Sequence, residues 1–155
     1  MSPVTLRRRL LLPLLALALI GCSGGDPKKE FLDKANGICD EAEDDFANVR
    51  QPTSVVELAP FAEKTLAIVQ KAQRELAALT PPEQDRAELE TRVLNPFAEL
   101  VTEAEGFVER VKAAGQDQAQ LITLISQRPD PSKIDLAYMR SYGLQTCADA
   151  IQLGT

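Results

Sequence analysis

Residues 26–50, DPKKEFLDKANGICDEAEDDFANVR, carry the period of an amphipathic helix. Apolar residues recur there every three or four positions, which places them along one side of a helix. They are Phe31, Ala35, Ile38, Cys39, Ala42, Phe46 and Val49. Asp26 before Pro27 is typical of a helix start, with an N-cap side chain and proline at the first helical position. We expect the helix to end near Arg50, and Gly37 either weakens it by about 1 kcal/mol or lets another backbone come close.

The same spacing continues towards the C-terminus through two more long segments. A capping-box pattern of Ser54 and Glu57 opens a second expected helix, which runs to about Leu79. Pro60 falls just beyond its first turn and should bend this helix or delay its start. A third helix is expected over residues 80–115, with another capping box at its start and a C-terminal glycine. We expect Pro96 to kink it or divide it in two.

Two shorter helices complete the expected fold. One covers residues 117–126, and the other is capped by Ser132 and runs to about Tyr142, where Gly143 ends it. Cys147 lies beyond that helix. No segment alternates polar and apolar residues over the length of a strand. The sequence therefore predicts an all-α fold, an antiparallel bundle of four to five helices with one disulfide.

A different kind of segment precedes the helices. Three arginines at positions 7–9 are followed by an apolar run from Leu10 to Ile20, which is too short to span a bilayer. The run ends in Leu19-Ile20-Gly21-Cys22, which resembles the lipobox of bacterial lipoproteins. That resemblance implies that residues 1–21 are a signal peptide and that Cys22 carries diacylglycerol. The alternative is a buried helix with Cys22 as a small core residue.

The lipobox resemblance also implies a location and a domain division. Two acyl chains on Cys22 give stable membrane attachment, so we expect the protein on the extracytoplasmic side of the cell membrane. Ser23 would permit the outer membrane if the host has one. Residues 22–27 form a tether, and residues 28–155 form the helical bundle domain. Lysines close to the tether either meet anionic lipid or are ordinary solvated side chains; they are Lys28, Lys29 and Lys34.

Two cysteines remain after the predicted cleavage, Cys39 and Cys147. An even pair in an exported chain favours one disulfide, because the compartment outside the cytoplasm permits oxidation. Two free buried thiols, or a redox pair, are the alternatives. A bridge would pin the last segment of the chain onto the first helix.

Composition restricts the chemistry that the chain can perform. Histidine is absent from all 155 residues, which removes Ser-His-Asp and Cys-His catalysis and imidazole-based metal sites. Removing residues 1–21 takes away three arginines and no acid, so the net charge falls from −6 to −9. An acidic domain argues against a nucleic-acid partner. We therefore expect no enzyme activity and no cofactor.

The densest polar feature is the run from Asp40 to Asp45. On a helix, Asp40 and Asp44 share one face, and Glu41 and Asp45 share the next. These four carboxylates form a solvated face, an acidic contact surface for a partner protein, or less readily a cation site. Near the C-terminus, Tyr138, Met139 and Tyr142 either line a small pocket or close the end of the core.

The mature chain also resembles a set of small exported helical proteins and lipoproteins, chiefly of actinobacteria. The likeness rests on Ile38-Cys39 with Ala42 and Phe46, on Leu79-Thr80-Pro81-Pro82, and on Tyr142-Gly143-Leu144-Gln145-Thr146-Cys147. It implies a helical bundle and a disulfide, and it implies no particular activity.

These features together lead to a functional hypothesis. We expect a lipid-anchored, non-catalytic interaction module that contacts a partner protein of the cell envelope through acidic helix faces. The alternative is a binding protein for a small apolar or cationic ligand, held between helices kinked at Pro60 and Pro96.

Overall fold

The computed structural model of the protein describes residues 25–153. The predicted signal peptide, the lipidation site Cys22 and the first part of the tether lie outside these residues. Within the described range the chain is helical and contains no strand. The helices are α1 (Pro27–Ala47), α2 (Leu58–Ala78), α3 (Arg86–Leu89), α4 (Asn95–Ala114), α5 (Gln118–Ile125), α6 (Leu136–Tyr142) and α7 (Gln145–Leu153).

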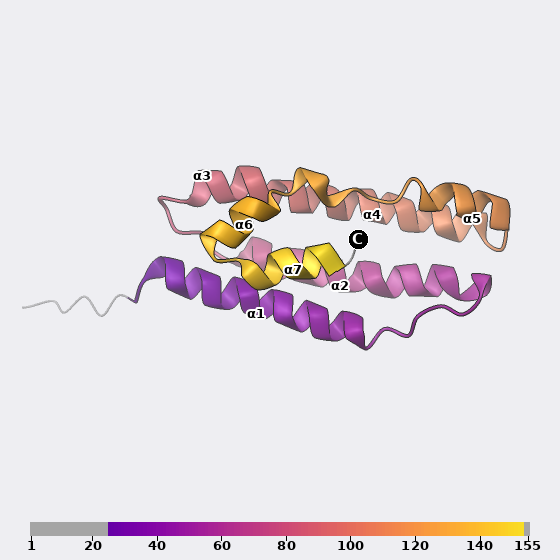
Figure 1. Ribbon diagram of the computed structural model, residues 1–155, viewed down its shortest axis with the longest axis horizontal. Helices are drawn as coiled ribbons and strands as arrows, with labels where there is room; N and C mark the ends of the chain where they lie inside the picture. The colour runs from indigo at the N-terminus through magenta and orange to yellow at the C-terminus, as the bar shows by residue number, and fades with distance from the viewer. Residues whose placement is uncertain (1–24, 154–155) are drawn as a thin grey trace, which may run out of the picture.

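Three long helices set the shape of the molecule (Figure 1). α2 packs against both α1 and α4, and α7 packs against α1. The loop from α1 to α2 lies at one end, and the loop from α2 to α3 lies at the other (Figure 1). Since α3 continues into α4 through a π-helical turn, Glu90–Leu94, the described chain has six separate helices rather than the predicted four to five.

The first helix forms much as its sequence predicts. The carboxylate of Asp26 accepts a hydrogen bond from the backbone N–H of Lys28 at 3.0 Å, which satisfies one of the otherwise unpaired N–H groups of the first turn. The helix ends at Ala47, earlier than expected. Asn48 then caps it, because its side-chain amide donates to the carbonyl oxygen of Asp44 at 2.8 Å.

The expected capping boxes are wrong in detail. The Ser54 side chain makes no capping hydrogen bond. The Glu57 carboxylate instead accepts from the backbone N–H and the hydroxyl of Thr53, at 2.7 and 2.9 Å. A 3-10 turn follows Ser54, and α2 begins only at Leu58, so Pro60 lies within its first turn. The delayed start at Pro60 is therefore confirmed, since proline's missing N–H costs least there.

The third helix departs further from its prediction. Thr80 caps no helix, and α3 begins at Arg86, after the two consecutive prolines Pro81 and Pro82 and a turn. The interruption expected near Pro96 takes the form of the π-helical turn. Proline cannot donate to the preceding turn, and a wider turn just before it accommodates that missing hydrogen bond.

The C-terminal region contains one more helix than expected. Ser132 lies in a 3-10 turn, and α6 starts at Leu136 with Asp135 as its N-cap. Gly143 ends α6 as predicted, with a φ of 111°. Cys147, expected beyond the last helix, lies within α7.

Two apolar clusters form the core. The larger joins α1, α2, the α3 region, α6 and α7, with Leu89 and Met139 almost completely buried. The smaller joins the end of α4 to α5 and consists of Val111, Ala114, Leu121 and Leu124. Met139 and Tyr142 are both buried in the larger cluster, which favours the interpretation that this region closes the core. Among the described residues, no helix is long and apolar enough to cross a membrane.

Candidate functional site

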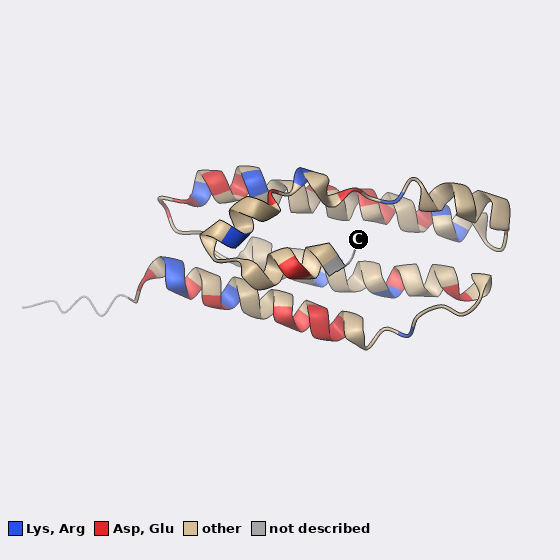
Figure 2. Ribbon diagram, viewed as in Figure 1, with Lys and Arg blue, Asp and Glu red and all other residues tan. Residues whose placement is uncertain are grey.

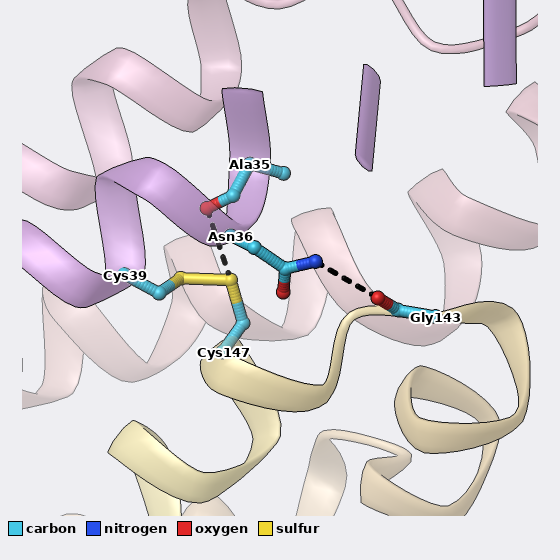
Figure 3. The surroundings of a disulfide bond; sticks show 5 residues. All are labelled: Ala35, Asn36, Cys39, Gly143 and Cys147. Atoms are coloured by element: carbon cyan, nitrogen blue, oxygen red, sulfur yellow. Dashed lines mark hydrogen bonds between the residues drawn. A yellow bond between two sulfur atoms is a disulfide. The ribbon is translucent and has the colours of Figure 1, made fainter. Parts of the chain in front are cut away.

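The Cys39–Cys147 disulfide is present and joins α1 to α7 (Figure 3). Its two cysteines are 6% and 2% exposed and belong to the larger apolar cluster. Cys147 Sγ lies 3.3 Å from the carbonyl oxygen of Ala35 (Figure 3). A disulfide sulfur has no proton to donate, so we regard this approach as a packing contact. The bridge is enclosed by apolar side chains, in a setting typical of a structural disulfide.

Asn36 reinforces the same junction. Its side-chain amide donates to the carbonyl oxygen of Gly143 at 2.9 Å, next to the disulfide (Figure 3). Its amide oxygen is buried and has no hydrogen-bond partner in the described chain. Sequence reasoning missed Asn36, because nothing in its local pattern indicates that a residue 107 positions away lies beside it.

The predicted acidic residues lie along the second half of α1 (Figure 2). The structure divides them into two pairs. Glu41 and Asp45 face α2, where Lys71 Nζ lies 2.5 Å from Glu41 Oε1 and 3.4 Å from Asp45 Oδ2. The hydrogen bond to Glu41 is the largest cause that raises the pKa of Lys71 above its ordinary value. These two carboxylates are therefore engaged in holding α1 and α2 together.

The other pair faces solvent. Asp40 and Asp44 are exposed, and so is Glu43, which the original set of four did not include. Within the described residues no ion pair engages the side chains of these three. We define the outer acidic face as Asp40, Glu43 and Asp44. It combines the two predicted residues that have no ion-pair partner among the described residues with Glu43, which the prediction did not include.

The lysines near the tether have local partners. Lys29 pairs with Asp33, and Lys34 pairs with Glu30, each at 2.6 Å. Hydrogen bonding to Asp33 is the main cause that raises the pKa of Lys29. Lys28 Nζ lies 3.9 Å from the centre of the Tyr142 ring. These contacts reduce the positive charge that this end of the bundle offers to anionic lipid.

The tyrosines predicted near the C-terminus form a stacked pair. The ring centres of Tyr138 and Tyr142 are 5.7 Å apart, and the Tyr142 hydroxyl donates a hydrogen bond to Asp85 Oδ2 at 2.7 Å. Burial is the main cause that raises the pKa of Tyr142 far above its ordinary range. Arg92 lies over the Tyr138 ring at 4.5 Å. The arrangement closes this end of the core and leaves the hydroxyl committed to an internal bond.

Space for a ligand between α1 and α2 is small. The crevice there is lined by Ile38, Ala42 and Lys71, among others, and it is too narrow to admit a water molecule. A ligand held between these two helices would therefore have to separate them. Among the described residues no group of three or more cysteine, aspartate or glutamate side chains is placed to hold a metal ion.

Comparison with known proteins gives no family assignment. No protein-family model matches the chain, and neither a curated protein nor a solved structure shows significant similarity to it.

Proposed function

We propose that the protein is a lipid-anchored, extracytoplasmic lipoprotein that acts without catalysis as an interaction module in the cell envelope. The observation that carries this proposal is the outer acidic face of α1. Its three carboxylates are exposed, and they lie beside a pair whose charge Lys71 partly offsets. Uncompensated charge gathered on one rigid helix attracts a basic surface and orients it.

The proposed anchor supports this orientation. A tether from Cys22 to Pro27 reaches at most about 18 Å, at ~3.5 Å per residue. The first turns of α1 would then stay close to the headgroups. The outer acidic face lies in the second half of α1, away from the end of the helix that the tether joins (Figure 2). Repulsion between carboxylates and anionic lipid would turn this face away from the bilayer.

The bundle supplies the rigidity that a contact surface needs. We interpret the long helices as an antiparallel bundle, because α1 and α4 both contact α2 and the successive loops lie at opposite ends (Figure 1). The disulfide and the ion pairs of Lys71 hold α1 against α7 and α2. A partner would therefore meet a face that is already ordered, which reduces the entropic cost of binding.

Crosslinking in intact cells tests the proposed contact. A photoreactive amino acid replaces Ala47, which is exposed and follows Asp40 and Asp44 along the same side of α1. We expect discrete adducts with envelope protein, and we expect Asp44→Lys to abolish them. Glu90→Lys makes the same charge change on the π-helical turn and should leave the adducts intact. Adducts that persist in the Asp44→Lys variant would exclude the outer acidic face as the contact.

A further inference from the structure

An open groove of about 460 Å³ lies between α4 and the loop that follows α5. Glu103, Gly106 and Arg110 line it from α4, and Gln127, Arg128 and Pro129 line it from the loop. The groove is open to solvent, because most of its lining side chains are exposed. Sequence reasoning did not single out this groove, because its two sides come from separate segments.

The groove contains two arginines and a single acidic residue, Glu103. Within residues 25–153, no ion pair engages the guanidinium of Arg110 or of Arg128. The nearby cations Lys112 and Lys133 are both paired with glutamates. Asp130, two positions after Arg128, directs its carboxylate to the backbone N–H and hydroxyl of Ser132, at 2.9 and 2.7 Å. Two guanidinium groups without an ion-pair partner among the described residues therefore line one hollow, and the carboxylate of Asp130 offsets part of the charge of Arg128 through space.

The acidic residue of the groove, Glu103, has an ion-pair partner outside it. Glu103 Oε1 lies 2.9 Å from Lys133 Nζ, which also lies 3.7 Å from Glu99 Oε2. The hydrogen bond to Glu103 is the main cause that raises the pKa of Lys133. The negative charge of Glu103 is thus partly offset from outside the groove, where the two arginines outnumber it.

The shape of the groove depends on a glycine within α4. Gly106 costs the helix about 1 kcal/mol relative to alanine. A side chain there would extend into the groove, with its Cβ 3.6 Å from Arg110 Nη1. The Arg110 guanidinium carbon lies 5.9 Å from the centre of the Phe107 ring, a cation–π distance that favours its orientation. Gly106 therefore leaves space beside a positioned cation.

We propose that this groove binds a small soluble molecule that carries a phosphate group or two carboxylates. Guanidinium groups bind such oxyanions through paired, charge-assisted hydrogen bonds, and the Gln127 amide supplies a further donor. This site is separate from the outer acidic face of α1, and its ligand has the opposite charge to the cationic ligand that the sequence suggested as an alternative. The proposal does not depend on the interaction-module function.

Thermal unfolding of the full chain in mild detergent tests the site, with inorganic phosphate and succinate as probes at constant ionic strength set by chloride. A ligand that binds the folded state raises the unfolding midpoint in a saturable way. We expect this response to at least one probe. Arg110→Gln and Arg128→Gln should each weaken binding by about tenfold or more, because each removes a charge-assisted pair. Arg74→Gln removes an equal charge outside the groove and should leave the response unchanged.

Two further variants separate recognition from general charge. Arg110→Lys keeps the positive charge but lacks the planar guanidinium group. We therefore expect its affinity for the probe to lie between the affinities of the wild type and of Arg110→Gln. Gly106→Leu should fill the groove and abolish the response, whereas Gly37→Leu, in open space on α1, should preserve it.

Three results would overturn the proposal. The first is a wild-type response to both probes that does not saturate, as expected from the general stabilising effect of phosphate. The second is an equal loss of response in Arg74→Gln and the groove variants. The third is arginine-dependent binding to anionic phosphatidylglycerol vesicles with no response to either soluble probe, which would assign the groove to a lipid surface.

Discussion

At the scale of single residues, two glycines occupy contrasting environments. Gly37 lies within α1, and a Cβ built on it would meet no atom within 4 Å. Gly143 has a φ of 111°, and a Cβ there would lie 3.0 Å from Leu32 Cδ1. The prediction that Gly37 lets another backbone come close is therefore wrong, because the space beside Gly37 is open. A close contact occurs instead at Gly143, and it is with the side chain of Leu32.

The same substitution should have opposite effects at these two glycines. Gly37→Ala should raise the free energy of unfolding by about 0.5–1 kcal/mol, because alanine loses less backbone entropy in a helix. Gly143→Ala should lower it, since alanine is strained at positive φ and its methyl group meets Leu32. Urea denaturation of both variants measures the difference. A loss of stability in Gly37→Ala would show that α1 has a neighbour at that position.

Asp135 provides a test of pH dependence at one carboxylate. Its Oδ1 accepts from the Tyr138 N–H at 2.8 Å, and Arg92 donates to its Oδ2 at 2.8 and 3.1 Å. The backbone hydrogen bond is the largest cause that lowers the pKa of Asp135 below its ordinary value of 3.8. The ionised carboxylate of Asp135 therefore makes its full contribution to the free energy of unfolding when the pH is above that ordinary value. This contribution is lost as the pH falls through the folded-state pKa of Asp135.

Asp135→Asn isolates this contribution, because asparagine still serves as an N-cap but carries no charge. The wild type should be more stable than the variant by a constant amount near neutral pH. The difference should shrink below about pH 4 as Asp135 gains its proton. Urea denaturation from pH 7 to pH 2.5 measures it. A difference that stays constant over this whole range would mean that the charge of Asp135 contributes nothing.

At the scale of elements, hydrophobic periodicity predicted the helices better than the capping motifs predicted their starts. The stripe from Phe31 to Phe46 gave α1 correctly, because burying an apolar face depends on the whole segment. A capping box depends on one local geometry, and the proline at position 60 and the prolines at 81 and 82 change that geometry. Helix starts therefore moved from Ser54 to Leu58 and from Thr80 to Arg86.

α7 was missed for a related reason. Gly143 correctly indicated the end of one helix, and the segment after it was too short for its period to be distinctive. Leu144, Cys147 and Ala148 are all buried, so tertiary packing on α1 accounts for the stability of this helix. An isolated helix of this length would be marginal in water.

Loss of the disulfide should therefore affect α7 more than the other helices. In Cys39→Ala/Cys147→Ala, we expect faster amide hydrogen exchange in α7, with α2 and α4 changing less. The loop closed by the bridge spans 108 residues, for which chain entropy predicts a loss of about 4–5 kcal/mol in unfolding free energy. Reduction of the wild type should reproduce both effects. Equal protection of the α7 amides from hydrogen exchange with and without the bridge would show that packing alone holds α7 in place.

At the scale of the whole molecule, the sequence predicted an all-helical chain and the covalent link between its ends. It did not predict that Lys71 would divide the acidic run into an inner pair and an outer face. That division requires the register of α2 against α1, which no local pattern contains. The arginine groove was unpredicted for the same reason, since α4 and the loop after α5 form it only when folded.

Membrane attachment should depend on Cys22 alone. The lipobox resemblance implies two acyl chains on this residue, and two chains suffice for stable attachment. The paired lysines at the start of α1 supply little attraction of their own, because Lys29 and Lys34 are already bonded to carboxylates. We therefore expect Cys22→Ser to move the protein from the membrane fraction to the soluble fraction, as measured by sedimentation after a high-salt wash.

The matched control is Cys39→Ser, which also removes one cysteine but breaks the disulfide instead of the anchor. It should remain in the membrane fraction while its unfolding midpoint falls, whereas Cys22→Ser should be released with its midpoint unchanged. This pair separates anchoring from folding, because the tether joins α1 at a single point and the bridge lies inside the core. A Cys22→Ser protein that has lost residues 1–21 and still stays bound would contradict the lipid anchor and would leave the bundle surface itself as the membrane contact.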